Sequence, residues 1–150
     1  MKKLQINAAL QIQKPVQEVY DAIVDPSKMS VYFISKSTAP MEEGKTVWWE
    51  FPEFEGSSPV RVGKMKPNEL IVFSWDIGDK AMTVEINLIL QKDGSTLVKV
   101  TEGEMENDET GLNWLKGNTE GWANFLACLK AYLEYGINLR KGAFDFMRKN

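Results

Sequence analysis

Apolar and polar residues alternate along the first part of the chain. Every second position over residues 4–12 is apolar, which is the period of a strand with one buried face. Pro15 then stands at a favourable first position of a helix, and apolar residues recur at helical spacing over residues 16–23. Asp25-Pro26 interrupts that helix, and a second short helix is expected around residues 27–31. The opening pattern therefore predicts one strand followed by two short helices.

The centre of the chain carries segments rich in β-branched and aromatic residues, which favour strands. Short turn signals separate the later segments, namely Pro67-Asn68, Gly78-Asp79 and Asp93-Gly94. Such turns join neighbouring antiparallel strands into hairpins. The predicted strands cover residues 46–51, 60–66, 69–77, 81–91 and 95–104. Together with the first strand, they predict an antiparallel sheet of about six strands.

One apolar face of this sheet needs a cover, and the C-terminal part of the chain supplies an amphipathic helix. Its apolar residues follow the i, i+3, i+4, i+7 spacing: Trp122, Phe125, Leu126, Leu129, Tyr132 and Leu133. Asn118 or Thr119 is expected to cap this helix, and Gly136 to end it. A start near Asp108 is the alternative, although two glycines weaken the additional turns.

The composition is that of an ordinary globular domain. A length of 150 residues fits one domain over residues 1–150. The net charge of −3 gives no basic patch for phosphates, so no nucleic acid is expected as a partner. Cys128 has no second cysteine to pair with, and neither a signal peptide nor a membrane-spanning apolar run is visible. We therefore expect a cytoplasmic protein without a membrane span.

The sequence contains no histidine. This absence removes serine–histidine and cysteine–histidine nucleophile pairs, imidazole metal sites and the commonest general base. Any catalysis would have to use carboxylates, lysine, tyrosine or a bound cofactor. The residues predict neither a metal site nor a cofactor.

The predicted order is a strand, two short helices, a run of antiparallel strands and a long C-terminal helix. This α+β order resembles the helix-grip (START-like, SRPBCC) superfamily. Particular segments narrow this resemblance: KPVQEVYDAIVDP, MSVYF, Gly44 with Trp49 and Phe51, Gly63 with KPNELIVFSW, TLVKVTEGE, and GWANFLACLKAYLEYG. Through these segments the chain resembles the family of homologues of the activator of the 90-kDa heat-shock protein ATPase. Tyr32 is a departure, because many relatives carry a tryptophan in that position.

The resemblance implies a curved sheet that grips the last helix, with a cavity between them suited to small hydrophobic molecules. It implies no shared catalytic motif, since members range from ligand carriers to cyclase-like enzymes and co-chaperone domains. The apolar candidates for the cavity are Tyr32, Phe33, Trp49, Phe51, Phe73, Trp75, Trp114, Trp122, Phe125, Leu126 and Leu129. The polar candidates are Glu50, Arg61 and Asn113. Ordinary core packing is the competing interpretation of each apolar residue.

Among further polar residues, strand alternation places Glu85 opposite the apolar stripe of its strand, towards solvent, and assigns neither Glu102 nor any other polar residue to the cavity. A carboxylate buried in the cavity would be costly unless it had partners, so it would indicate function. Of the neighbours Trp48 and Trp49, alternation sends Trp49 inward and Trp48 outward. The C-terminal tail carries enough apolar residues to dock on its own domain or on a second subunit.

Three functions remain open at this stage. The leading hypothesis is the binding of a small hydrophobic molecule, possible roles being lipid or secondary-metabolite handling or stress response. The second is a protein-interaction module for a heat-shock chaperone, which rests on the resemblance alone. The third is a cyclase- or hydratase-like enzyme in which Tyr32 or Glu50 moves a proton. The outward Trp48 and the apolar tail also suggest a homodimer.

Overall fold

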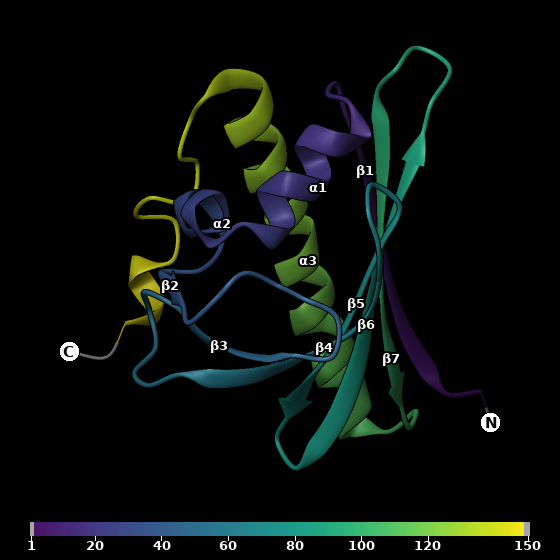
Figure 1. Cartoon of the computed structure of the whole chain (residues 1–150). Helices are drawn as coiled ribbons and strands as arrows, with labels where there is room; N and C mark the ends of the chain where they lie inside the picture. Colours follow the sequence, from purple (N-terminus) through teal and green to yellow (C-terminus); the bar gives the residue numbers. More distant parts are fainter. Residues whose placement is uncertain (1, 149–150) are drawn as a thin grey trace.

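A computed structural model describes residues 2–148 of the chain and has the α+β architecture that the sequence predicts (Figure 1). The strands are β1 (Leu4–Ile12), β2 (Lys36–Ser37), β3 (Thr46–Glu50), β4 (Ser58–Lys66), β5 (Leu70–Ile77), β6 (Lys80–Leu90) and β7 (Thr96–Met105). The helices are α1 (Val16–Val24), α2 (Pro26–Tyr32), α3 (Glu109–Tyr135) and the short 3-10 helix η1 (Asp145–Met147).

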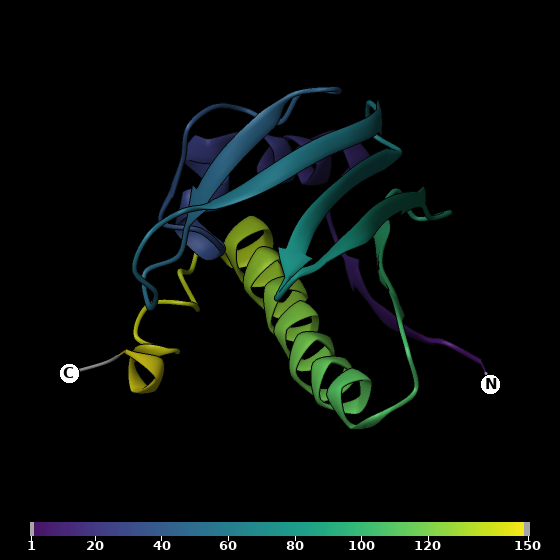
Figure 2. The ribbon, with the colours of Figure 1, turned by 90° about the horizontal axis from the view of Figure 1, so that it is seen from below.

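All strands join one antiparallel sheet in the order β1-β7-β6-β5-β4-β3-β2. The sheet curves over α3, which lies in its concave side (Figure 2). This arrangement confirms the predicted helix-grip fold. The prediction of about six strands missed β2. This strand has only two residues, which pair with Trp49 and Glu50 at the end of β3. Two residues are too few to show a periodic pattern.

The last helix begins at Glu109, well before the expected cap at Asn118 or Thr119. The Asp108 side chain caps it by accepting a hydrogen bond from the Gly111 amide at 2.8 Å. The expected cap is therefore wrong and the earlier start is right. Gly136 ends the helix with φ 65°, the left-handed conformation that glycine adopts without strain.

Gly111 and Gly117 both lower the helical propensity of α3, but the structure gives them different roles. A Cβ at Gly111 would lie 1.9 Å from the backbone oxygen of Glu106. Residue 111 must therefore be glycine, because the backbone at Glu106 lies too close to α3 to leave room for a side chain. A Cβ at Gly117 would meet no atom within 4 Å, so this glycine is not required for packing.

The two positions should respond to alanine in opposite directions. We expect Gly111→Ala to lower the free energy of unfolding by about 2–3 kcal/mol, the usual cost of forcing extra volume into a packed site. Gly117→Ala should raise it by about 0.5–1 kcal/mol through helix propensity alone. Urea unfolding followed by circular dichroism measures both changes. Equal effects of the two substitutions would contradict these roles.

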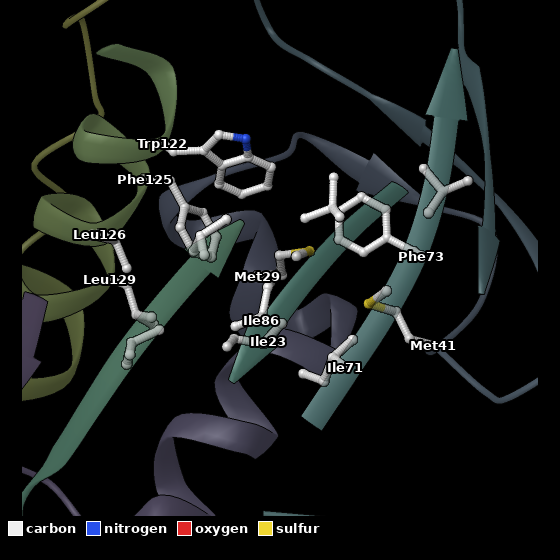
Figure 3. Packing of buried hydrophobic residues seen from close by; sticks show 14 of the residues in the cluster. Ile23, Met29, Met41, Ile71, Phe73, Ile86, Trp122, Phe125, Leu126 and Leu129 are labelled. Carbon is white, nitrogen blue, oxygen red and sulfur yellow. The ribbon is translucent and has the colours of Figure 1, made fainter. Parts of the chain in front are cut away.

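The core fills the space between the sheet, α1, α2 and α3. In Figure 3, Trp122, Phe125, Leu126 and Leu129 point from α3 towards the strands, with Phe73 among the side chains opposite them. Leu126 and Leu129 are almost completely buried, which fits the amphipathic pattern of this helix. Trp49 is buried, whereas Trp48 is 44% exposed, as strand alternation predicted.

Candidate ligand pocket

The core does not fill the whole concavity. A pocket of about 380 Å³ lies between the aromatic side chains of the sheet, one face of α3 and the chain that follows α3. Its wall comes from the end of α2, the loop after β3, the end of β5, α3 and the tail over residues 137–148. We call this last segment the C-terminal tail. A pocket of this size lies within the range of small-molecule sites.

Five rings form the apolar wall of the pocket, and we call them the aromatic wall: Phe33, Phe51, Trp75, Trp122 and Phe125. Each ring contacts the next in one continuous series. The centroid distances are 5.3 Å for Phe51–Phe33, 4.8 Å for Phe33–Phe125, 5.2 Å for Phe125–Trp122 and 5.6 Å for Trp122–Trp75. Such tilted and edge-to-face contacts hold the rings rigidly against one another.

Two glycines of α3 leave open space in front of this wall. Gly117 and Gly121 line the pocket, and a Cβ at either position would meet no atom within 4 Å. Asn124 and Cys128 continue the same face of the helix, since the spacing of i, i+4, i+7 and i+11 is that of one helical stripe. Small and polar residues on this stripe keep α3 from filling the pocket.

The structure divides the predicted apolar candidates into two groups. Tyr32 and the aromatic wall line the pocket. The other candidates are buried core residues outside the lining: Trp49, Phe73, Trp114, Leu126 and Leu129. Trp49 and Phe73 lie behind the wall, with ring centroids 5.7 Å from Phe33 and 5.4 Å from Trp75, respectively. This second group packs in the core and does not border the pocket.

None of the three polar candidates lines the pocket. Glu50 is half-buried at the end of β3, and Asn113 is exposed on α3. The Arg61 side chain lies outside and donates to Asp76 at 2.8 Å and to Ser74 at 3.2 Å. The residue types alone could not identify these positions, because a polar side chain looks the same in sequence whether it faces the cavity or the solvent.

The C-terminal tail closes one side of the pocket through a buried ion pair. Arg140 of the tail pairs with Glu53 of the loop after β3 through both carboxylate oxygens, and both side chains are largely buried. The Arg140 guanidinium also stacks over the ring of Phe144 at 4.9 Å. Arg140, Glu53, Phe144 and Met147 all line the pocket. Sequence reasoning missed Arg140 and Glu53, since nothing in the sequence indicates that the tail contacts the loop after β3.

A carboxylate lies behind the aromatic wall. Glu102 of β7 is completely buried and has no salt bridge with any lysine or arginine between residues 2 and 148. Its Oε2 accepts a hydrogen bond from the indole of Trp75 at 2.8 Å. Its Oε1 accepts from the indole of Trp122 at 2.8 Å and from Asn118 Nδ2 at 3.2 Å. These three donors offset the cost of burying the carboxylate.

Two titratable side chains line the pocket without being free to react. The Tyr32 hydroxyl is buried and donates to the Ala22 backbone oxygen at 2.9 Å. Burial raises the pKa of Tyr32 well above its usual value, so the phenol stays protonated. Burial also raises the pKa of the Cys128 thiol, against a smaller opposing effect of Arg140. A raised thiol pKa makes Cys128 a weak nucleophile.

A second depression of about 630 Å³ is larger and about as open as the first. It is lined by the β4–β5 turn over residues 66–70 and by the end of β6 over residues 87–90. Leu90 in this region is 65% exposed. Because no aromatic residue lines this depression, the pocket beside α3 is the better candidate for a ligand site.

Two negative observations apply to residues 2–148. No helix in this part of the chain is long and apolar enough to cross a membrane. The same residues contain no cluster of three or more cysteine, aspartate or glutamate side chains with metal-binding geometry.

The curved sheet, the long helix within it and the pocket between them define a START-like, helix-grip protein. The family model described as Activator of Hsp90 ATPase homolog 1-like protein matches residues 13–134. The chain therefore belongs to this family, as its motifs indicated. A comparison with curated protein sequences gives no match.

Solved structures with the same fold cover most of the chain. The protein SSP2350 from Staphylococcus saprophyticus is 29% identical, with a TM-score of 0.79 over 89% of this chain and 94% of that one. The Aha1 dimer from Colwellia psychrerythraea is 20% identical, with a TM-score of 0.74 over 89% of this chain and 98% of that one. DynU16, a putative protein in the dynemicin biosynthetic locus, is 22% identical, with a TM-score of 0.77. The match to DynU16 covers 88% of this chain and 48% of that chain.

Proposed function

We propose that the protein binds a small, mainly apolar molecule in the pocket between the aromatic wall, α3 and the C-terminal tail. The observation that carries this proposal is the stripe of small residues on α3. Gly117 and Gly121 leave open space in front of five contacting aromatic rings. An apolar ligand that covers these rings would remove their surface from water, which is favourable by about 25 cal/mol for each Å².

The proposal is tested with 2-naphthol, which is flat, mainly apolar and small enough for a pocket of about 380 Å³. Isothermal titration calorimetry of the full chain should give saturable binding with one molecule per chain. Native mass spectrometry of the freshly purified protein would also reveal a ligand that co-purifies. The proposal would be contradicted if saturable binding and a co-purified molecule were both absent.

The C-terminal tail would act as the cover of this site, held by the Arg140–Glu53 ion pair. Cys128 reports on this cover because its thiol lines the pocket and is 5% exposed. We expect a thiol reagent to reach it faster when the tail opens locally.

Breaking the ion pair should therefore expose Cys128. In Glu53→Ala, we expect 5,5′-dithiobis(2-nitrobenzoate) to label Cys128 several-fold faster than in the wild type, because a bidentate charge-assisted hydrogen bond is lost. Glu55→Ala is the matched control, since Glu55 is exposed in the same loop and lies outside the pocket lining. Equal labelling rates of the wild type and Glu53→Ala would show that the ion pair does not hold the tail.

Protein interaction is a second candidate function. It is favoured by exposed apolar side chains near the pocket and on the tail, including Phe54, Leu139 and Phe146 at 57%, 51% and 83% exposure. Such a surface suits a protein partner. The family description suggests an Hsp90-type ATPase as that partner. Addition of the protein to a purified Hsp90 should then change its ATPase rate, and an unchanged rate would speak against this function.

The same surface suits a second copy of the chain, and one protein of the same fold is described as a dimer. Multi-angle light scattering at high concentration distinguishes a monomer from a dimer.

We do not favour the enzyme hypothesis. The Tyr32 hydroxyl is bound to a backbone oxygen, and Glu50 is not part of the pocket lining.

A further inference from the structure

Most charged groups at the pocket are already paired with one another. Glu53 pairs with Arg140, and Asp76 pairs with Arg61. A ligand therefore meets few polar atoms that are free to form a directional hydrogen bond. Asn118 is the polar lining residue whose orientation the surrounding structure fixes.

The hydrogen bonds of Glu102 determine which end of the Asn118 amide faces the carboxylate. The indoles of Trp75 and Trp122 can only donate, so Glu102 serves as their acceptor. Because a carboxylate can only accept, the end of the Asn118 amide that faces it is the donor Nδ2, at 3.2 Å from Oε1. The amide oxygen Oδ1 then points away from Glu102. Among residues 2–148, no side-chain hydrogen bond to Oδ1 is found, and the buried unpaired side-chain atom there is Trp114 Nε1, so Oδ1 is accessible to a ligand.

From this arrangement we propose that Asn118 Oδ1 is the acceptor by which the pocket selects apolar ligands that carry a hydroxyl or N–H donor. Glu102 is the positioning residue, because it holds the amide in the orientation that presents oxygen to the ligand. This inference rests on the proposed function and adds the chemical class of the ligand. In an apolar pocket, one fixed acceptor discriminates between ligands more strongly than it adds affinity.

The test compares 2-naphthol with 2-methoxynaphthalene, which has the same ring system and a methyl group in place of the hydroxyl hydrogen. Calorimetry of the wild type should show roughly tenfold tighter binding of 2-naphthol, the usual effect of one hydrogen bond in a buried site. Asn118→Leu keeps the size of the side chain and removes the acceptor. This substitution should lower the preference to about one, mainly through weaker binding of 2-naphthol.

Asn113→Leu is the matched control, because Asn113 is exposed on the same helix and is not part of the pocket lining. It should keep the wild-type preference. Glu102→Ala tests the positioning role, since it removes the oxygen that holds Asn118 Nδ2 and leaves the Asn118 amide free to turn. Its folded fraction should also lose the preference for 2-naphthol, a change in ligand ratio that a loss of stability alone would not produce.

The possible outcomes separate this inference from the function on which it rests. Equal affinities of the wild type for the two probes, or a preference that survives in Asn118→Leu, would overturn the role of Asn118 while leaving ligand binding intact. Failure of the wild type to bind either probe would contradict both proposals. If Glu102→Ala does not fold, the comparison of Asn118→Leu with Asn113→Leu still decides the case.

Discussion

Replacement of Gly121 with phenylalanine is expected to prevent ligand binding without unfolding the protein. The new ring has room, since a Cβ at this position meets no atom within 4 Å. Packing against Phe125 and the rest of the aromatic wall would remove the ring from water, which favours the orientation into the pocket. The affinity for 2-naphthol should fall roughly a hundredfold or more, equivalent to about 2.7 kcal/mol.

Gly121→Ala provides the matched control for this substitution. Its methyl group should raise the stability of α3 by about 0.5–1 kcal/mol and leave most of the pocket volume free. Calorimetry gives the affinities of both variants, and urea unfolding verifies that both are folded. A folded Gly121→Phe protein that binds 2-naphthol like the wild type would place the ligand site elsewhere.

Loss of the Glu102 carboxylate should be among the most destabilising single changes in this protein. Glu102→Ala removes the common acceptor of two indoles and an amide. Trp122 is 3% exposed, so water cannot easily replace the lost partner of its indole N–H. Each orphaned buried donor costs about 1–3 kcal/mol, and we expect a total loss of roughly 2–4 kcal/mol in the free energy of unfolding.

The control for this prediction is Glu85→Ala. Glu85 lies on the neighbouring strand β6, but its side chain is exposed on the outer face of the sheet. Its removal should change the free energy of unfolding by less than about 0.5 kcal/mol. Denaturation followed by circular dichroism is the suitable measurement, because tryptophan emission would itself respond to the loss of Glu102. A Glu102→Ala protein as stable as Glu85→Ala would contradict the structural role of the network.

The sequence predicted the fold well because periodicity reports directly on burial. The alternation over residues 4–12 and the helical spacing from Trp122 to Leu133 each identify an element and its buried face. The boundary of α3 was harder to predict. Gly111 looks like a helix breaker in sequence, whereas in the structure it is required by the close approach of Glu106. Such a contact between neighbouring segments has no periodic signature.

The pocket was predicted less completely than the fold, for a physical reason. Large apolar residues at regular spacing serve equally well as core and as pocket lining, so Leu129 and Trp122 looked equivalent in sequence although only Trp122 borders the pocket. The more informative signal was the small side chains of Gly117 and Gly121 on one face of an otherwise apolar helix. Distant partners such as Arg140 and Glu53 become evident only when the chain is folded.

The inward position of Glu102 was also missed. Val98 and Val100 are buried on the same face of β7 as Glu102, so strand alternation carried a signal for an inward carboxylate that sequence reasoning did not use. The expectation that a buried carboxylate must have partners was nevertheless sound. Those partners are two tryptophans and an asparagine from separate elements.

The most direct test of ligand binding in this pocket follows the indole N–H signals of the tryptophans by ¹H–¹⁵N NMR during titration with 2-naphthol. Trp75 and Trp122 belong to the aromatic wall, whereas Trp48 lies outside the pocket lining and is 44% exposed. We expect the signals of Trp75 and Trp122 to shift and saturate together while that of Trp48 stays in place. Unchanged Trp75 and Trp122 signals throughout the titration would contradict the proposed ligand site.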